Sequence, residues 1–180
     1  MERNILSDIA DTEDFHRTLE DMQSEKKILI FRDTRHSDTT EQFLTMLYEA
    51  VVTDENLSVT LVIDEVHELE FSKGSALYHI IEKGRGNGIS LISIFQGAHE
   101  MKPRQFSMLN QSAVKLMFGI SDAEDARKCV ASAGLKPVAQ FTELLGSLPK
   151  QTCLVTGSLE DKEGSLRPGR FVVVSIPDAD

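Results

Sequence analysis

Two adjacent carboxylates, Asp64 and Glu65, directly follow a run of apolar and β-branched residues at positions 60–63. Such a run predicts a strand buried on both faces, as in a parallel sheet covered by helices. Ligands of open α/β sheets bind at the carboxyl ends of strands, which is where both acids fall. In a nucleotide hydrolase the first carboxylate would hold the magnesium shell, and the second would orient and polarise the attacking water. This is the Walker B pattern, although strands ending in Asp-Glu also arise by chance or as helix caps.

The rest of the chain predicts the elements that must position this pair. Apolar residues at helical spacing predict helices over 12–23, 38–52, 72–83, 103–110 and 121–133, with a short helical turn at 141–145. Asp38 with Glu41, and Ser121 with Glu124, have the spacing of capping boxes. Apolar runs predict strands over 28–31, 60–63, 89–95 and 113–120, followed by an antiparallel hairpin of 152–156 and 171–176. Strands alternating with helices predict an α/β fold with a mostly parallel sheet flanked by helices and a C-terminal antiparallel hairpin.

Composition narrows the class of protein. A chain of 180 residues suits one globular domain, which we place at 28–176, after a helical lead-in at 1–27 and before a tail at 177–180. The net charge of −10 argues against a broad nucleic-acid-binding face, although local basic residues such as Lys102 and Arg104 leave a DNA contact open. Cys129 and Cys153 are isolated, which predicts buried free thiols of a cytoplasmic protein. We find no signal peptide and no apolar run of membrane-spanning length.

Further motifs follow in order. The segment from Lys83 to Gly97, KGRGNGISLISIFQG, joins a helix end in Gly-Arg to a strand with Gln at its tip, one helix downstream of the Walker B-like strand. After the next strand comes SDAEDARKCVASAGL, at 121–135. This ordered set resembles the HerA- and FtsK-type P-loop ATPases over roughly 28–176. The resemblance implies a RecA-like, ASCE-type core, which is incomplete here because the Walker A loop is absent.

The resemblance also implies roles. Asp64 would bind Mg²⁺, Glu65 would be the catalytic carboxylate, and Gln96 would be the sensor between water and the γ-phosphate of ATP. Arg85 would be a trans-acting arginine finger that reaches a neighbouring subunit's nucleotide. The ATPases of this kind are ring-shaped hexamers that move DNA, or motors of conjugation and secretion. Both His67 and His99 are interpreted as surface or internally satisfied histidines rather than ligands.

The sequence lacks G-x-x-x-x-G-K-[ST], the loop that cradles phosphates with backbone N–H groups and a lysine. Two accounts stay open. In the first, the chain is the second half of a HerA-type domain, and the phosphate-binding half lies on another polypeptide or is lost. In the second, RDTRHSDTT at 32–40 is a decayed Walker A loop, with Arg32 and Ser37 at the glycines, Asp38 at the lysine and Thr39 at the Ser/Thr. Asp38 would then repel the phosphates.

Both accounts predict little or no ATP hydrolysis by the isolated chain. The primary hypothesis is an ATPase-derived subunit or fragment of a DNA-translocation or conjugative-transfer motor, oligomeric with subunits that supply Walker A. The competing hypothesis is a catalytically inactive ATPase-fold module that docks to active ring subunits. A third class, a minimal phage or mobile-element packaging ATPase, would need an intact phosphate loop.

Overall fold

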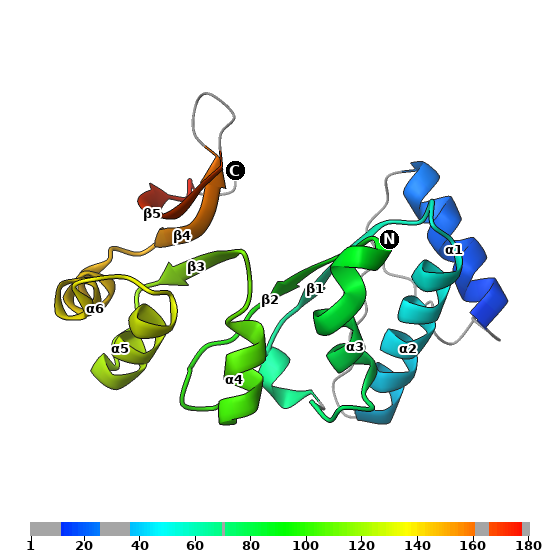
Figure 1. The fold of residues 1–180 in the computed structure, drawn as a ribbon, viewed down its shortest axis with the longest axis horizontal. Coiled ribbons are helices and arrows are strands. Elements are labelled where there is room, and N and C mark those ends of the chain that lie inside the picture. Colours follow the sequence, from blue (N-terminus) through cyan, green and yellow to red (C-terminus); the bar gives the residue numbers. More distant parts are fainter. Residues whose placement is uncertain (1–11, 26–36, 70, 161–165, 178–180) are drawn as a thin grey trace. The chain divides into compact units, whose positions relative to one another are not determined.

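The computed structural model describes residues 12–25, 37–69, 71–160 and 166–177 (Figure 1). The chain forms two compact units, Met1–Gln96 and Gly97–Asp180, called here the first and the second unit. The strand predicted at 28–31 and most of the polar loop after it lie outside the described residues. None of the helices in the described ranges has the length and apolar character needed to cross a membrane.

The first unit contains three α-helices and two strands among its described residues. The helices are α1 (Thr12–Glu25), α2 (Ser37–Thr53) and α3 (Ala76–Lys83), and the strands are β1 (Val59–Ile63) and β2 (Ile89–Ser93), with the short 3-10 helices η2 (Val66–Glu68) and η3 (Gly84–Asn87). β1 and β2 pair in parallel, from Val59 opposite Ile89 to Ile63 opposite Ser93. The helix predicted at 12–23 and the strands predicted at 60–63 and 89–95 are confirmed.

Two predicted helix starts in the first unit were wrong. α3 begins four residues later than predicted, because Ser75 is its N-cap and accepts a hydrogen bond from the Tyr78 amide. α2 begins at Ser37, one residue before the start predicted at Asp38, where Glu41 was expected to complete a capping box. The Glu41 carboxylate instead accepts a hydrogen bond from the Ala76 amide at 2.5 Å. Glu41 therefore caps α3, a helix 35 residues further along the chain.

The helices of the first unit cover one face of its sheet. α2 contacts α3, and α3 contacts β2. In Figure 1 both helices lie to the same side of β1 and β2. The buried side chains of these elements form the core: Leu47, Val51, Leu77, Ile80, Ile63 and Ile89. α1 adds Phe15, which is fully buried. Its ring packs edge-on against the Phe43 ring, with 5.5 Å between the two ring centroids.

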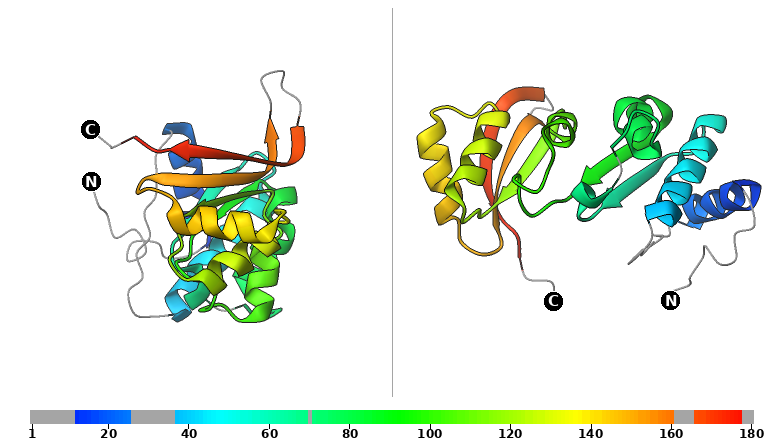
Figure 2. Two further views of the ribbon diagram at one scale, coloured as in Figure 1. Left: turned by 90° about the vertical axis from the view of Figure 1, so that its left-hand side faces the viewer. Right: turned by 90° about the horizontal axis from the view of Figure 1, so that it is seen from below.

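The second unit consists of α4 (Pro103–Leu109), β3 (Val114–Phe118), α5 (Ala123–Ser132), α6 (Val138–Ser147), β4 (Thr152–Glu160) and β5 (Leu166–Ser175). Its strands form an antiparallel sheet in the order β3-β4-β5, visible in both views of Figure 2. The predicted hairpin is confirmed, and so is the mixed α/β class. The described strands form a parallel pair and a three-stranded antiparallel sheet, where the sequence predicted one mostly parallel sheet.

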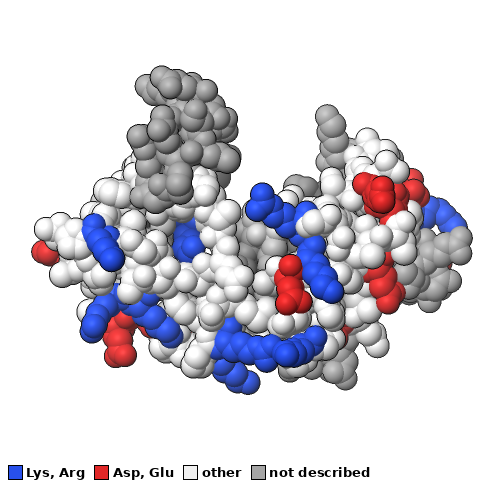
Figure 3. Space-filling model, viewed as in Figure 1, with Lys and Arg blue, Asp and Glu red and all other residues white. Residues whose placement is uncertain are grey.

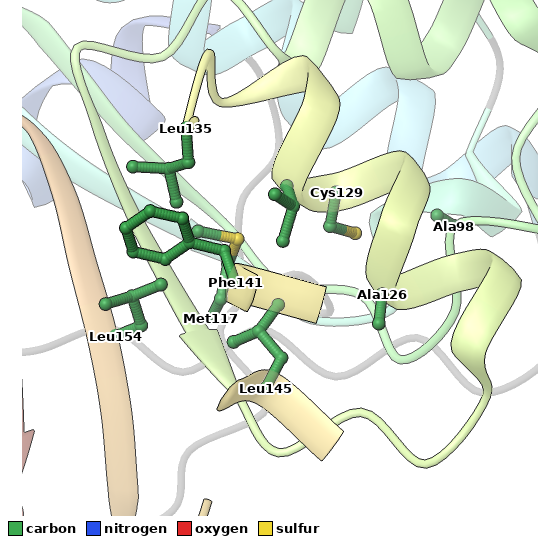
Figure 4. Close-up of a cluster of buried hydrophobic side chains, with 9 residues drawn as sticks. Ala98, Met117, Ala126, Cys129, Leu135, Phe141, Leu145 and Leu154 are labelled. Atoms are coloured by element: carbon green, nitrogen blue, oxygen red, sulfur yellow. The ribbon is translucent and has the colours of Figure 1, made fainter. Parts of the chain in front are cut away.

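One face of the antiparallel sheet packs against α5 and α6. Met117 and Leu154 are register partners on this face, and they meet α5 and α6 in the apolar cluster drawn in Figure 4. Phe141 of α6 also meets the Phe171 ring edge-on at 4.7 Å. Both cysteines, Cys129 and Cys153, are buried free thiols as predicted, and burial raises the pKa of the Cys129 thiol.

Candidate functional site

The candidate site lies in the first unit, at the carboxyl ends of β1 and β2. Because the two strands are parallel and Ile63 lies opposite Ser93, β1 and β2 end side by side at the same end of the sheet. Backbone pairing continues past the strands: the Ile94 amide donates to the Ile63 carbonyl at 2.8 Å, and the Val66 amide donates to the Ile94 carbonyl at 3.1 Å. The residues that follow each strand are therefore held side by side.

A strained turn aims the acidic pair. Glu65 has φ 50° and ψ 43°, a left-handed conformation that costs a residue with a side chain about 1–2 kcal/mol. Two neighbours hold it there: the Asp64 carboxylate accepts a hydrogen bond from the Glu65 amide at 3.0 Å, and the Val66 side chain is fully buried. Strain of this kind persists where the surroundings over-determine it, and it clusters at functional sites.

The structure brings Glu65 and Gln96 together. The Gln96 side-chain amide donates a hydrogen bond to Glu65 Oε1 across 31 residues of sequence. The His67 ring lies beside the second carboxylate oxygen of Glu65, with a distance of 3.4 Å between His67 Nδ1 and Glu65 Oε2. Asp64 and Gln96 are exposed and the Glu65 side chain is 30% exposed, so the three polar groups can reach a ligand.

His67 is a residue that the sequence interpretation missed as a member of the site. It is half-buried, and its ring lies beside the Glu65 carboxylate to which Gln96 donates a hydrogen bond. The left-handed turn at Glu65 makes this contact possible, and no local pattern in the sequence signals such a turn at a glutamate. His99 is exposed and hydrogen-bonded to Asp125 within the second unit.

Arg85 does not join this group. It is exposed in η3, which precedes β2, whereas Gln96 follows β2. The two residues therefore lie towards opposite ends of the same strand. Because Arg85 precedes β2 and Gln96 follows it, Arg85 does not lie beside the Glu65–Gln96 pair of its own chain. The predicted arginine finger would therefore have to act on the nucleotide of another subunit.

The described residues fit half of a magnesium–nucleotide site. Exposed carboxylates such as Asp64 and Glu65 are the oxygen ligands that Mg²⁺ takes in phosphate-processing sites. Phosphates bind where a helix begins with free N–H groups, often after a glycine-rich turn. The helix that follows β1 cannot serve, because Ser75 and the carboxylate of Glu41 already occupy the amino end of α3. The ends of β1 and β2 thus present carboxylates of the kind that could hold Mg²⁺, while the capped amino end of α3 is not open to a phosphate.

Charge is unevenly divided between the two units. Met1–Gln96 contains nine Lys and Arg against nineteen Asp and Glu, whereas Gly97–Asp180 contains ten of each. On the face drawn in Figure 3, Lys and Arg side chains stand in separate groups with uncharged surface between them.

Comparison with known proteins gives a fold relationship. No protein-family model and no curated protein matches the sequence. Among solved structures, the chain is similar to the genome packaging NTPase B204 from Sulfolobus turreted icosahedral virus 2 in complex with AMPPCP, with 15% identity and a TM-score of 0.56 over 89% of this chain and 72% of that one. It is also similar to B204 in complex with ATP-gammaS (14% identity, TM-score 0.55, 84% and 70% of the two chains).

A third match is the DNA-packaging ATPase B204 from Sulfolobus Turreted Icosahedral Virus, at 13% identity and a TM-score of 0.54 over 80% of this chain and 66% of that one. At these identities the similarity concerns the fold. The fold of this chain is therefore similar to that of B204, which agrees with the sequence resemblance at the level of the fold alone.

Proposed function

We propose that this chain is the carboxylate-bearing part of a P-loop-type ATPase from a DNA-translocating motor of the HerA/FtsK kind, and that another polypeptide supplies its phosphate-binding loop. The observation that carries the proposal is the hydrogen bond between Gln96 and Glu65 at the shared edge of β1 and β2. A carboxylate held by an amide on the neighbouring strand is the pairing that a water-activating acid and a sensor residue require.

Each residue has a stated part in this proposal. A bound magnesium nucleotide would supply the phosphorus that water attacks. Asp64 would hold the ion, because its carboxylate is exposed at the strand end. Glu65 would orient the water and take its proton, with Gln96 hydrogen-bonded to one carboxylate oxygen and the His67 ring beside the other. Arg85 would act toward the nucleotide of a neighbouring subunit.

The printed names of the neighbours support the DNA-moving part of the proposal. B204 is described as a genome packaging NTPase and a DNA-packaging ATPase, in structures with AMPPCP and ATP-gammaS. A packaging motor, the third class that the sequence suggested, therefore belongs among the parent systems considered for this chain. The missing phosphate loop separates this chain from a complete enzyme of that class.

ATP turnover by the purified chain tests the proposal. We expect none above background with Mg²⁺ and ATP, and we expect weak binding by calorimetry, because nothing in the chain replaces the loop lysine. Robust turnover by the chain alone, abolished in Glu65→Gln, would contradict the need for a second polypeptide. Turnover that appears only with a Walker A donor and disappears in Glu65→Gln would support it.

A second candidate function follows from the same missing loop: an inactive module that docks to active ring subunits. The discriminating variant is again Glu65→Gln. If the chain changes the ATP turnover of an active ATPase subunit, and the Glu65→Gln variant of the chain changes that turnover by the same amount, the chain acts by docking. If Glu65→Gln abolishes the effect, the carboxylate takes part in chemistry.

A further inference from the structure

We infer that His16, Glu20 and Asp54 of the first unit form a binding site for one divalent transition-metal ion, with Zn²⁺ as the ion that these donors suit best. The site joins α1 to the turn that follows α2. Asp54 precedes β1, whereas Asp64 and Glu65 follow it. The inference therefore uses none of the residues of the proposed ATPase site and does not depend on the proposed function.

Three polar side chains share one face of α1. His16, Glu20 and Gln23 are separated by four and then three residues, which places their side chains on the same face of an α-helix. α1 packs against α2 (Figure 1). The Gln23 side chain donates a hydrogen bond to the Asn56 carbonyl at 3.0 Å and accepts one from the Ser58 amide at 2.9 Å. These two bonds hold the turn after α2 against this face of α1 without any ion.

Asp54 is held by the turn to which it belongs. Its backbone amide donates to the Ala50 carbonyl at 3.2 Å, at the end of α2. One carboxylate oxygen, Oδ1, accepts hydrogen bonds from the Asn56 backbone amide at 2.9 Å and from the Asn56 side-chain amide at 3.2 Å. The other oxygen, Oδ2, lies 3.5 Å from His16 Nε2. Ligating carboxylates are themselves hydrogen-bonded in metal sites, so Asp54 already has the orientation of a ligand.

The His16 ring lies between two carboxylates. His16 Nε2 is near Asp54 Oδ2, and His16 Nδ1 is 3.7 Å from Glu20 Oε2. One donor atom from each residue can be chosen so that all three lie within 4.8 Å of one another. Nitrogen and oxygen ligands at about 2.0–2.2 Å from a tetrahedral Zn²⁺ are about 3.4 Å apart. The distance between His16 Nε2 and Asp54 Oδ2 therefore suits an ion bound by both atoms.

Glu20 is the ligand that adjusts. Its side chain is 53% exposed, whereas those of His16 and Asp54 are 26% and 22% exposed. The Glu20 carboxylate therefore has room to turn from His16 Nδ1 toward an ion at Nε2. Three protein ligands would leave the fourth position of a tetrahedral ion to water.

The donor set selects the kind of ion. Mg²⁺ and Ca²⁺ take oxygen ligands, whereas an imidazole nitrogen suits transition-metal ions such as Zn²⁺. The two carboxylates balance the charge of one divalent ion. In the first unit nineteen acidic residues outnumber nine basic ones, and this excess of negative charge attracts cations to the unit.

A bound ion would fasten α1 to the segment that leads into β1. α1 already contributes Phe15 and Leu19 to the core, and the ion would add a polar attachment on the same helix. The ligands come from α1 and from the end of α2, so they meet only in the folded unit. An ion that binds only the folded state stabilises it, and its concentration would therefore set the stability of the first unit.

Calorimetry of the full chain without a histidine tag, titrated with ZnCl₂, tests the inference. We expect one equivalent of Zn²⁺ per chain, which an excess of Mg²⁺ or Ca²⁺ does not displace. His16→Gln, Glu20→Gln and Asp54→Asn should each weaken binding by about tenfold or more. The matched control is His79→Gln, which replaces a histidine of the same unit that stacks on Tyr48 and should leave the affinity unchanged.

A measurement on the unmodified chain guards against variants that fail to fold. In proton NMR, one equivalent of Zn²⁺ should shift the ring resonances of His16 and leave those of His79 in place. Gln23→Ala keeps all three ligands but removes the bonds that hold the turn, so it should weaken binding by about tenfold while the His16 resonances still shift at saturation.

Four results would overturn the inference. Absence of Zn²⁺ binding, or unchanged affinity in His16→Gln, would show that His16 only forms ion pairs with its two carboxylates. Loss of binding in His67→Gln instead would place the ion beside Glu65. Displacement of Zn²⁺ by Mg²⁺ would show binding by carboxylates alone. ATP turnover, present or absent, does not bear on any of these outcomes, so the inference and the proposed function can fail separately.

Discussion

The two units build their sheets in opposite ways. β4 and β5 are joined directly and pair antiparallel, and β3 completes a sheet whose inner face packs on α5 and α6. β1 and β2 are parallel and connected through α3, with helices on one face only. An antiparallel hairpin forms between neighbours in sequence, whereas a parallel sheet needs crossovers and cover on both faces. Among the described residues, the helices of the parallel unit therefore cover one face of its sheet and leave Val62, Ile92 and Ile94 of the other face exposed.

Both units expose an apolar sheet face, and their edges distinguish them. In the second unit Leu116, Val155 and Val172 are register partners on the uncovered face. No set of acidic and amide groups comparable to Glu65 and Gln96 stands at its edge within the described ranges. In the first unit such a set stands at the strand ends. An exposed apolar sheet face is therefore common to both units, and among the described residues the first unit adds to it a hydrogen-bonded acid and amide at the strand ends.

The largest expected effect concerns the two faces of the second sheet. Leu154 is fully buried, so Leu154→Ala should lower the free energy of unfolding by about 2–5 kcal/mol through lost burial and a residual cavity. Leu116→Ala, at a residue 57% exposed, should change it by about 0.5 kcal/mol or less. Urea unfolding followed by circular dichroism measures both. Equal losses would show that the face of Leu116 is covered in solution.

A smaller effect separates two glycines, one from each unit. Gly88 has φ 86°, and an added Cβ would lie 2.8 Å from the Leu57 carbonyl oxygen. Gly134 has φ 72°, with nothing within 4 Å of an added Cβ. In both alanine variants the left-handed backbone conformation should lower the free energy of unfolding by about 1–2 kcal/mol. Gly88→Ala should lose more stability than Gly134→Ala because the turn that leads into β2 must also move, and the same unfolding measurement decides.

The two units also differ in how their helices are capped, and the loss of one N-cap side chain lowers the free energy of unfolding by about 1 kcal/mol. The Asp122 carboxylate accepts a hydrogen bond from the Asp125 amide at 2.8 Å and caps α5. Asp122→Ala should therefore cost about that amount. Ser75→Ala should cost less, because Glu41 also caps α3. Ser121→Ala is the control, since the structure gives the cap to Asp122. A loss in Ser121→Ala as large as in Asp122→Ala would contradict the assignment.

The smallest effect is a pH dependence confined to the second unit. The hydrogen bond and charge of Asp125 raise the pKa of His99 above its ordinary value of 6.5, with Glu100 and Asp122 adding to the effect. The pair's contribution to stability is fully present below pH 6.5 and is lost as pH rises through the raised pKa. Unfolding free energies between about pH 5 and 9 should fall over that window, and His99→Gln should flatten the profile. An unchanged slope in His99→Gln would contradict this origin.

Local patterns predicted much of the fold. Apolar runs located β1, β2 and the final hairpin, because strands are rich in apolar and β-branched residues. The burial of both faces predicted for 60–63 was wrong, since Val62 is 56% exposed. The same patterns missed the cap of α5, since Ser121 and Asp122 are both good caps and only the backbone path selects Asp122. They also gave Glu41 the wrong partner, because its carboxylate meets a helix 35 residues away.

The sequence by itself determined that two carboxylates follow one apolar strand, that Gln96 follows the next, and that it contains no G-x-x-x-x-G-K-[ST] loop. Residue type and spacing suffice for this, because each of these features is local. Only the tertiary structure decided that Glu65 turns left-handed to meet Gln96 and His67, and that α2 and α3 leave one sheet face bare. Contacts across 31 residues depend on strand register and helix placement, which the whole first unit sets through its packing.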